Sequence, residues 1–275
     1  MYNNYQNPYN NLQQGNNAAF DPSMMNQYNK MAMDNFRPDY SEKGDDLEPY
    51  GIFNPKDTNV RLGFIRKVYL ILSVQLLITT MFVLLAFLHA PFSEFQKKNV
   101  WLVIVASVVT LITVYALGCY KTLARSVPTN YILLTIFTLG QSYSVSFTAS
   151  FYDPKTVMIA AILTTAIVIA LTLYAIFTTS DFTTMGGILI VLLVGLTVGS
   201  IVGIFIKNRI YHTIIAICSA IVFGIYLVFD TQLVIGENSR AYSIDDYIFA
   251  AMNLYIDIIQ IFLQLLKILG EVQNN

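Results

Sequence analysis

From residue 68 onward, the chain consists of long apolar runs separated by short polar connections. Each run holds about 20 residues, the length that a helix needs to cross a bilayer. We predict seven such helices, at approximately residues 68–88, 100–120, 130–151, 155–178, 185–206, 211–235 and 245–269. A transmembrane β-barrel would instead show segments of about ten residues in which apolar and polar positions alternate. The pattern therefore predicts an all-α polytopic membrane protein.

Connections of about 4 to 10 residues favour a compact bundle of sequential antiparallel helices, with no room for a soluble domain. The composition agrees with a bundle embedded in lipid. Of the 275 residues, 55% are hydrophobic and 12% are charged, whereas charged residues make up about a quarter of an ordinary globular chain. The mean hydropathy is +0.56. A net charge of −1 provides no basic field for nucleic acid, so we expect no nucleic-acid partner.

The first 50 residues differ in character from the rest of the chain. Their first 30 positions include 9 Asn, 4 Gln and 4 Tyr, and a segment this polar cannot bury enough apolar surface to offset the entropy of ordering it. We therefore predict a disordered cytosolic tail, which is either a solvated leader or a segment that binds adaptors. Residues 51–67 form a basic juxtamembrane segment, and residues 68–270 form the transmembrane domain.

The basic juxtamembrane segment also predicts the orientation. It places Lys56, Arg61, Arg66 and Lys67 directly before the first helix, and positive charge at the first helix usually selects the cytoplasmic side. Over the remaining connections, the Lys and Arg residues are almost evenly divided between the two sides. We therefore expect a cytosolic N-terminus and, after seven crossings, a C-terminus on the opposite side.

Two aspartates fall inside the predicted helices. Asp230 lies in YLVFDTQLVIG, about five residues before the end of the sixth helix, and Asp257 lies near the middle of the seventh. A charged residue inside the bilayer costs roughly 2.5–3.5 kcal/mol on insertion scales, so an acid retained there indicates a functional site. Both aspartates are candidates for engaging protons or ions.

The seventh helix carries a polar stripe along one face, at positions that alternate by four and three. The residues of this stripe are Asp246, Ala250, Asn253, Asp257, Gln260, Gln264 and Lys267. Almost all other positions are apolar, so the stripe must line a cavity or a polar seam between helices. We interpret Asp246, Asn253, Gln260 and Gln264 as lining a pore. The alternative is that they form ordinary hydrogen bonds between helices.

The third helix is also rich in small polar side chains. They are Thr138, Gln141, Ser142, Ser144, Ser146, Thr148 and Ser150. These side chains could complete the wall of a pore, or they could hydrogen-bond to neighbouring helices. The sequence leaves both interpretations open.

The sixth and seventh helices should be adjacent and antiparallel because their connection is short. In an ideal hairpin, Asp230 and Asp257 would nevertheless differ in depth by a helical turn or two. If they do meet, two carboxylates in a low-dielectric site cannot ionise comfortably together, and the pair can switch with pH. An ionised pair can attract a divalent cation, but calcium takes six to eight oxygens. We therefore expect Asp230 and Asp257 to bind calcium transiently rather than to store it.

Several segments resemble the transmembrane Bax inhibitor motif family, in its lifeguard or glutamate-receptor-associated branch. These segments are FIRKVYLILSVQLLITT (64–80), SFTASFYDPKTV (146–157), DFTTMGG (181–187), IFIKNRI (204–210), FDTQLVIG (229–236) and YSIDDYIFAAMNLYIDIIQIF (242–262). Together they extend over essentially the whole membrane part, and the C-terminal signature is highly specific.

The resemblance implies a seven-helix bundle with the last helix at its centre. It also implies a pH-sensitive calcium leak in the endoplasmic reticulum, Golgi or other endomembranes, which restrains stress-induced cell death. The paired aspartates of the family match Asp230 and Asp257, and no cofactor is implied beyond the permeant calcium. An arginine of the family that latches one aspartate is best matched by Arg125 in CYKTLARSVP, with Lys121 as a rival. Arg125 could equally be an ordinary cytosolic charge.

Three other functions are compatible with a bundle of seven membrane helices. An intramembrane aspartyl protease would also place two aspartates in neighbouring helices, but its Gly-x-Gly-Asp motif is absent, so we do not expect an enzyme. A retinal-binding receptor is disfavoured because the only lysine of the last helix, Lys267, lies at its end. The serious alternative is a non-conducting membrane scaffold that modulates partner channels or cell-death proteins through the tail.

Overall fold

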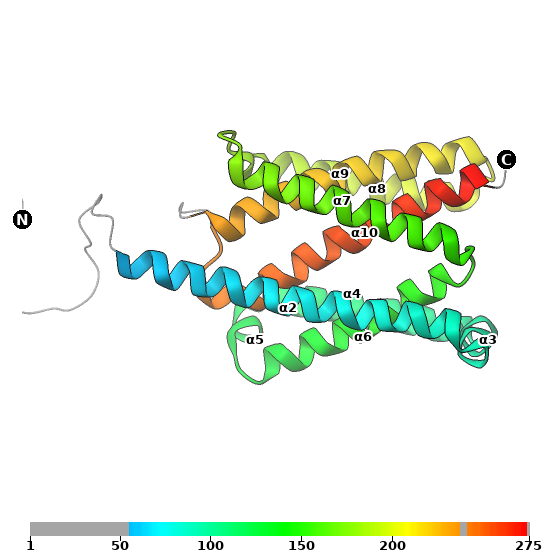
Figure 1. The fold of residues 1–275 in the computed structure, drawn as a ribbon, viewed down its shortest axis with the longest axis horizontal. Helices are drawn as coiled ribbons and strands as arrows, with labels where there is room; N and C mark the ends of the chain where they lie inside the picture. Colours follow the sequence, from blue (N-terminus) through cyan, green and yellow to red (C-terminus); the bar gives the residue numbers. More distant parts are fainter. Residues whose placement is uncertain (1–54, 237–240, 274–275) are drawn as a thin grey trace, which may run out of the picture. The chain divides into compact units, whose positions relative to one another are not determined.

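The computed structural model describes residues 55–236 and 241–273, and these residues are mostly helical (Figure 1). The helices are α2 (Pro55–Leu88), α3 (Ala90–Lys98), α4 (Val100–Cys119), α5 (Lys121–Arg125), α6 (Thr129–Ala149), α7 (Pro154–Phe177), α8 (Gly186–Phe205), α9 (Arg209–Ile235) and α10 (Tyr247–Gln273). Two 3-10 turns, η2 (Phe182–Met185) and η3 (Ile244–Asp246), precede α8 and α10. In this part of the chain, seven helices are long and apolar enough to cross a membrane, which confirms the predicted fold class. The predicted tail, residues 1–50, lies outside the described residues.

The predicted helix boundaries agree with the structure to within four residues, except at the start of the first helix. That helix begins at Pro55, well before the first long apolar run, and it includes most of the basic juxtamembrane segment. The reason is that hydrophobicity marks the part of a helix that meets lipid, whereas a helix continues wherever its residues tolerate the conformation. The short helices α3 and α5 were not predicted, because each lies within a polar connection.

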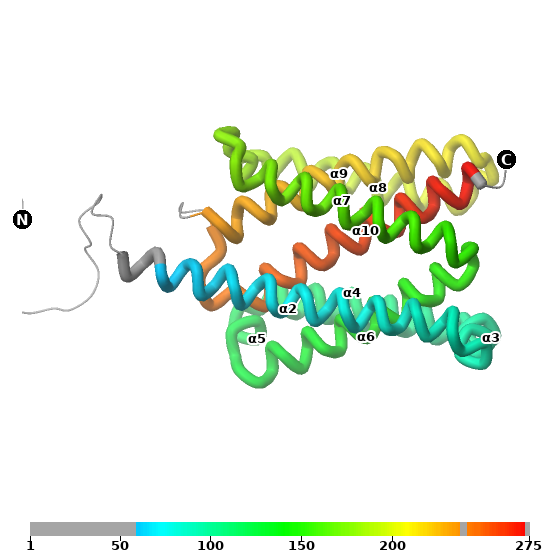
Figure 2. The backbone as a smooth tube through the Cα atoms, in the orientation of Figure 1, coloured from blue at the N-terminus to red at the C-terminus, as the bar shows by residue number. Residues whose placement is uncertain are grey.

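Six of the spanning helices form two groups, and α10 lies between them. One group contains α2, α4 and α6, and the other contains α7, α8 and α9. Figure 1 shows α10 crossing obliquely between the groups, and the backbone trace in Figure 2 shows the same path. Helix α10 contacts α9, α7, α2 and α6. The last helix is therefore at the centre of the bundle, as the family resemblance implied.

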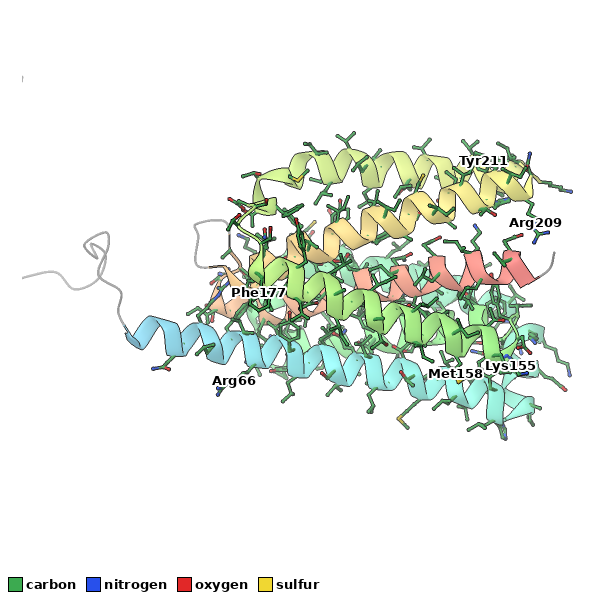
Figure 3. The ribbon with its side chains drawn as sticks, turned by 45° about the horizontal axis from the view of Figure 1, so that its top comes forward. Arg66, Lys155, Met158, Phe177, Arg209 and Tyr211 are labelled. Atoms are coloured by element: carbon green, nitrogen blue, oxygen red, sulfur yellow. The ribbon has the colours of Figure 1, made fainter. Side chains whose placement is uncertain are left out.

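Burial follows from this central position. In the most apolar stretch of α10, 61% of the residues are buried, compared with at most 39% in any other spanning helix of the described chain. The outer helices direct large apolar side chains away from the bundle, where lipid would cover them. Figure 3 labels two of them on α7, Met158 and Phe177, which are 59% and 79% exposed. The core and the lipid-facing surface are both apolar, so hydrophobicity alone does not distinguish them.

Buried hydrogen bonds join α6 to its neighbours. Gln75 of α2 donates to Thr138 at 3.0 Å, and Gln96 of α3 donates to Ser146 at 2.9 Å. Between them, Thr79 of α2 bonds to both Ser142 (2.8 Å) and Tyr255 of α10 (2.7 Å). Of the two interpretations of the third predicted helix, the structure therefore supports hydrogen bonding between helices for Thr138, Ser142 and Ser146.

Candidate functional site

The two intramembrane aspartates lie together in the structure. Asp230 is on the last part of α9 and Asp257 is on α10, and their side chains are 5% and 3% exposed. The two carboxyl groups are close enough to influence each other electrostatically. Two carboxylates that are buried this close together repel each other when both are ionised. The pair is thus a buried acid dyad within the membrane-spanning part of the chain.

The difference in depth expected for an ideal hairpin does not separate the pair. Helix α10 runs obliquely to α9 (Figures 1 and 2), so equal numbers of residues do not correspond to equal depth on the two helices. The connection also folds back on α9, because the Tyr242 N–H donates to the Leu233 carbonyl at 3.1 Å. An ideal antiparallel hairpin was therefore the wrong assumption.

A tyrosine and an asparagine complete the polar surroundings of Asp230. The Tyr242 hydroxyl donates to Asp230 Oδ1 at 3.1 Å, and Asn253 Nδ2 donates to the Tyr242 oxygen at 2.9 Å. Burial, together with the nearby Asp230 carboxyl, holds the pKa of the Tyr242 hydroxyl well above its usual range, so Tyr242 remains a donor. Asp257 Oδ2 is buried and has no hydrogen-bond partner within the described chain.

Tyr242 was not among the predicted site residues. It lies in the connection before α10, 12 residues from Asp230 and 11 from Asn253. Because Tyr242 lies outside both helices, helical spacing does not relate it to either residue. Tyr242 is the first residue of a segment that carries the family resemblance, YSIDDYIFAAMNLYIDIIQIF, but nothing in that segment indicates its contact with Asp230.

The predicted latch has a different partner from the one expected. Arg125 of α5 contacts Asp246, through Nε to Oδ1 at 2.7 Å and a terminal nitrogen to Oδ2 at 2.9 Å. This hydrogen bond and the charge of Asp246 raise the pKa of the Arg125 guanidinium. The reason is position: α5 lies at the same end of the bundle as η3, where Asp246 is located, whereas the aspartate dyad is buried deeper. The rival residue, Lys121, is exposed at the start of α5.

The residues of the predicted polar stripe therefore have different surroundings. Asp246 pairs with Arg125, and its role as a pore-lining residue stays a prediction. Asn253 belongs to the hydrogen-bonded group around Asp230. Gln260 and Gln264 are half-buried further along α10, and their role as pore-lining residues remains a prediction.

Arg61 of α2 was predicted only as part of a basic segment, but it makes long-range contacts next to the site. Its two terminal nitrogens donate to three backbone carbonyls, those of Tyr242 (2.6 Å), Leu233 (2.8 Å) and Val234 (2.6 Å). The last carbonyls of a helix have no partner within that helix and carry partial negative charge. Arg61 therefore ties α2 to both the end of α9 and the connection that follows.

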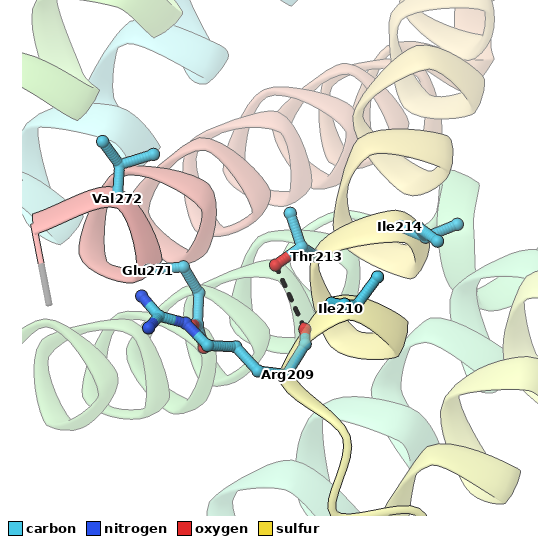
Figure 4. Close-up of a pocket in the computed structure, with 6 residues that line it drawn as sticks. All are labelled: Arg209, Ile210, Thr213, Ile214, Glu271 and Val272. Atoms are coloured by element: carbon cyan, nitrogen blue, oxygen red, sulfur yellow. Dashed lines mark hydrogen bonds and ion pairs between the residues drawn. The ribbon is translucent and has the colours of Figure 1, made fainter. Parts of the chain in front are cut away.

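At the opposite end of the bundle, the start of α9 meets the end of α10. Arg209 and Glu271 form an ion pair there. They line an open pocket of about 290 Å³ together with Ile210, Thr213, Ile214 and Val272 (Figure 4). The Thr213 hydroxyl is turned toward the protein, since it donates to the Arg209 carbonyl at 3.1 Å. The two charges of this pocket offset each other, so the aspartate dyad is the stronger candidate site.

The dyad alone does not provide a complete metal site. Among the described residues, no three or more His, Cys, Asp or Glu side chains gather around a common point. Two carboxylates offer fewer oxygens than the six to eight that calcium takes. Transient binding of calcium by the two aspartates stays a prediction.

Comparison with known proteins identifies the family. The sequence profile of the family described as "Inhibitor of apoptosis-promoting Bax1" matches residues 61–274. Human "Protein lifeguard 3" is 37% identical over 244 residues, covering 86% of this chain and 78% of the relative, and the mouse protein of the same name gives the same values. "Bax inhibitor 1" of Schizosaccharomyces pombe is 30% identical over 218 residues, covering 79% of each chain. The chain is therefore a multi-pass membrane protein of the Bax inhibitor family.

Proposed function

We propose that the protein is a pH-sensitive calcium leak of an endomembrane, and that protons and calcium engage Asp230 and Asp257. The observation that carries this proposal is the contact between two buried carboxyl groups on neighbouring spanning helices. Acidic residues are costly inside a membrane and are retained there mainly for ion or proton pathways. A purely structural role would be met more cheaply by neutral side chains such as the Thr and Ser residues of α6.

The chemistry of the dyad connects protons with calcium. While the two carboxyl groups share a proton, they carry a single negative charge between them and attract a divalent cation less strongly. Loss of that proton leaves two negative charges close together, which repel each other and attract a divalent cation. Protons and calcium thus compete for the same oxygens, and this competition makes flux through the site depend on pH.

The cellular part of the proposal comes from the relatives. Their names describe inhibition of Bax and of the apoptosis that it promotes. We propose that this chain likewise restrains stress-induced cell death, by lowering the calcium content of the endoplasmic reticulum or Golgi. The N-terminus is then cytosolic, and cell-death or channel proteins are its protein partners.

Calcium flux in reconstituted vesicles tests the proposal. The full chain is placed in liposomes that hold a calcium dye, and the rate of dye response is followed across pH for the parent, Asp257→Asn and Asp230→Asn. We expect a pH-dependent flux in the parent, and both its rate and its pH dependence to change in each variant. Asp245→Asn is the matched control, because Asp245 is an exposed aspartate just before α10, and it should behave as the parent.

Flux that is absent from the parent, or that ignores both pH and the substitutions, would refute the leak and favour the non-conducting scaffold. Removal of residues 1–50 is a second experiment that distinguishes the calcium leak from the non-conducting scaffold. The leak predicts that the shortened chain retains its flux, whereas the scaffold predicts that it loses its partner proteins.

A further inference from the structure

Tyr242 occupies the space between the aspartate dyad and the loop-side end of α9. Its backbone N–H is bonded to the carbonyl of Leu233, one helical turn closer to that end than Asp230. From there its side chain reaches back to Asp230. The edge of its ring packs against Phe249 of α10, with 5.9 Å between the ring centres. Tyr242 is thus wedged between α9 and α10 on the loop side of the dyad.

The hydroxyl of Tyr242 engages the same atom that a cation would need. It donates to Asp230 Oδ1, and it accepts from Asn253. A calcium ion binds carboxylate oxygens directly, so an ion that approaches Asp230 from the loop side must displace this hydroxyl. Tyr226 of α9 is the other phenol close to the two carboxyl groups, but it belongs to a helix and not to a connection.

Arg61 holds the backbone of Tyr242 in this position. One guanidinium nitrogen donates to the Tyr242 carbonyl, and the other donates to the last turn of α9, at Leu233 and Val234. The guanidinium also lies over the ring of Phe64, with 4.7 Å between its central carbon and the ring centre. The connection and α9 can separate only if these hydrogen bonds to a charged group are broken.

We propose that Tyr242 is a plug that closes the loop-side approach to Asp230 and Asp257, and that Arg61 is the clamp that keeps the plug closed. The proposal rests on the leak function inferred above, since a plug has meaning only if something passes. It assigns to Tyr242 a role in gating, and it assigns to Arg61 a positioning role that acts through Tyr242.

Flux measurements on matched variants test the two roles. Tyr242→Ala removes the plug and should raise the calcium flux of reconstituted full-length protein by about tenfold. Tyr242→Phe keeps the ring but loses the hydroxyl, so its flux should lie between those of the parent and Tyr242→Ala. Arg61→Gln should raise the flux as Tyr242→Ala does, while Arg61→Lys, which retains the charge, should raise it less.

Two controls separate gating from general damage. Arg66→Gln removes an exposed arginine of the same helix, which points away from the bundle in Figure 3. Tyr120→Phe removes the hydroxyl of an exposed tyrosine after α4. Both should match the parent. If the parent conducts calcium, a Tyr242→Ala or Arg61→Gln protein that folds and leaks no faster than the parent would overturn the plug.

Chemical labelling gives a readout that does not depend on flux. A water-soluble carbodiimide activates a carboxyl group, and an added amine displaces the urea to leave an amide that mass spectrometry locates. We expect Asp230 and Asp257 to resist labelling in the parent and to be labelled in Tyr242→Ala and Arg61→Gln. If labelling increases in both variants but no protein, the parent included, shows calcium flux, the leak is refuted, while Tyr242 and Arg61 are still shown to shield the two carboxyl groups. Unchanged labelling in both variants would refute the plug whatever the flux.

Discussion

Arg125 and Asp246 form a two-point ion pair that joins α5 to the start of α10, with donor–acceptor distances of 2.7 and 2.9 Å. The residues are 121 positions apart in the chain. The contact fixes the end of the connection that carries Tyr242, and it leaves the aspartate dyad without an arginine partner from α5. The loop-side end of the bundle is thus held by two arginines, Arg61 on α2 and Arg125 on α5.

Exchanging the charges of this ion pair tests its contribution. Arg125→Glu and Asp246→Arg should each lower the midpoint of thermal unfolding in detergent, and the double variant should recover most of the loss. The effect should be small and should shrink in high salt, because the pair is partly exposed. A double variant that is no more stable than either single variant would show that the pairing itself contributes nothing.

Thr79 should contribute more to the stability of the folded protein than its neighbour Thr80. Thr79 links α2 to Ser142 and Tyr255 by two buried hydrogen bonds, so Thr79→Val should destabilise the protein by about 1 kcal/mol. Thr80 is exposed and bonds only to the Leu76 carbonyl of its own helix, so Thr80→Val should change stability by less than about 0.5 kcal/mol. Thermal unfolding in detergent measures both. Equal effects would contradict the role of Thr79 in joining the helices.

Gly140 allows α4 and α6 to approach closely. A methyl group added at Gly140 would lie 2.7 Å from the Thr110 hydroxyl and 3.2 Å from the Ala106 carbonyl, so Gly140→Ala should cost about 1–3 kcal/mol through overpacking. Gly195 of α8 has open space at the same point, and Gly195→Ala should be neutral or slightly stabilising because alanine favours helices. A tolerated Gly140→Ala would mean that the two helices separate without cost.

Tyr242 predicts a specific loss of stability at alkaline pH. Its pKa is raised in the folded protein, chiefly by burial, while a tyrosine in the unfolded chain titrates near pH 10. The contribution of Tyr242 to the free energy of unfolding is therefore complete below about pH 10 and is lost above it. The reason is that, above this pH, the unfolded chain gives up a proton that the folded protein retains. Between about pH 9 and pH 11, the unfolding temperature of Tyr242→Phe should fall less than that of the parent. Tyr120→Phe is the control and should follow the parent.

The sequence was sufficient to predict the seven spanning helices, because a bilayer requires apolar runs of nearly fixed length. The aspartates were found for a related reason: an acid at positions 230 and 257 is conspicuous where almost every neighbour is apolar. Helical periodicity also located Asn253 on the face of Asp257. In each case the signal lies within one helix.

The contacts between distant segments could not be predicted in this way. Arg61 meets Leu233, Val234 and Tyr242 across more than 170 positions, and nothing in a basic segment before the first helix indicates those partners. Arg125 was assigned to the dyad by resemblance, but its partner depends on where α5 places it relative to η3. Such pairings are set by packing, which periodicity and composition do not encode.

Helix α2 has 34 residues, which at 1.5 Å per residue corresponds to a rod of about 51 Å. The hydrocarbon layer is about 30 Å thick, so roughly 20 Å of the rod must extend into the headgroups and beyond or be accommodated by tilt. Arg61 lies in that outer portion, where it bonds to the backbone of Tyr242. A torque applied to the outer portion of the rod would therefore be passed to the neighbourhood of Asp230 by the Arg61 side chain.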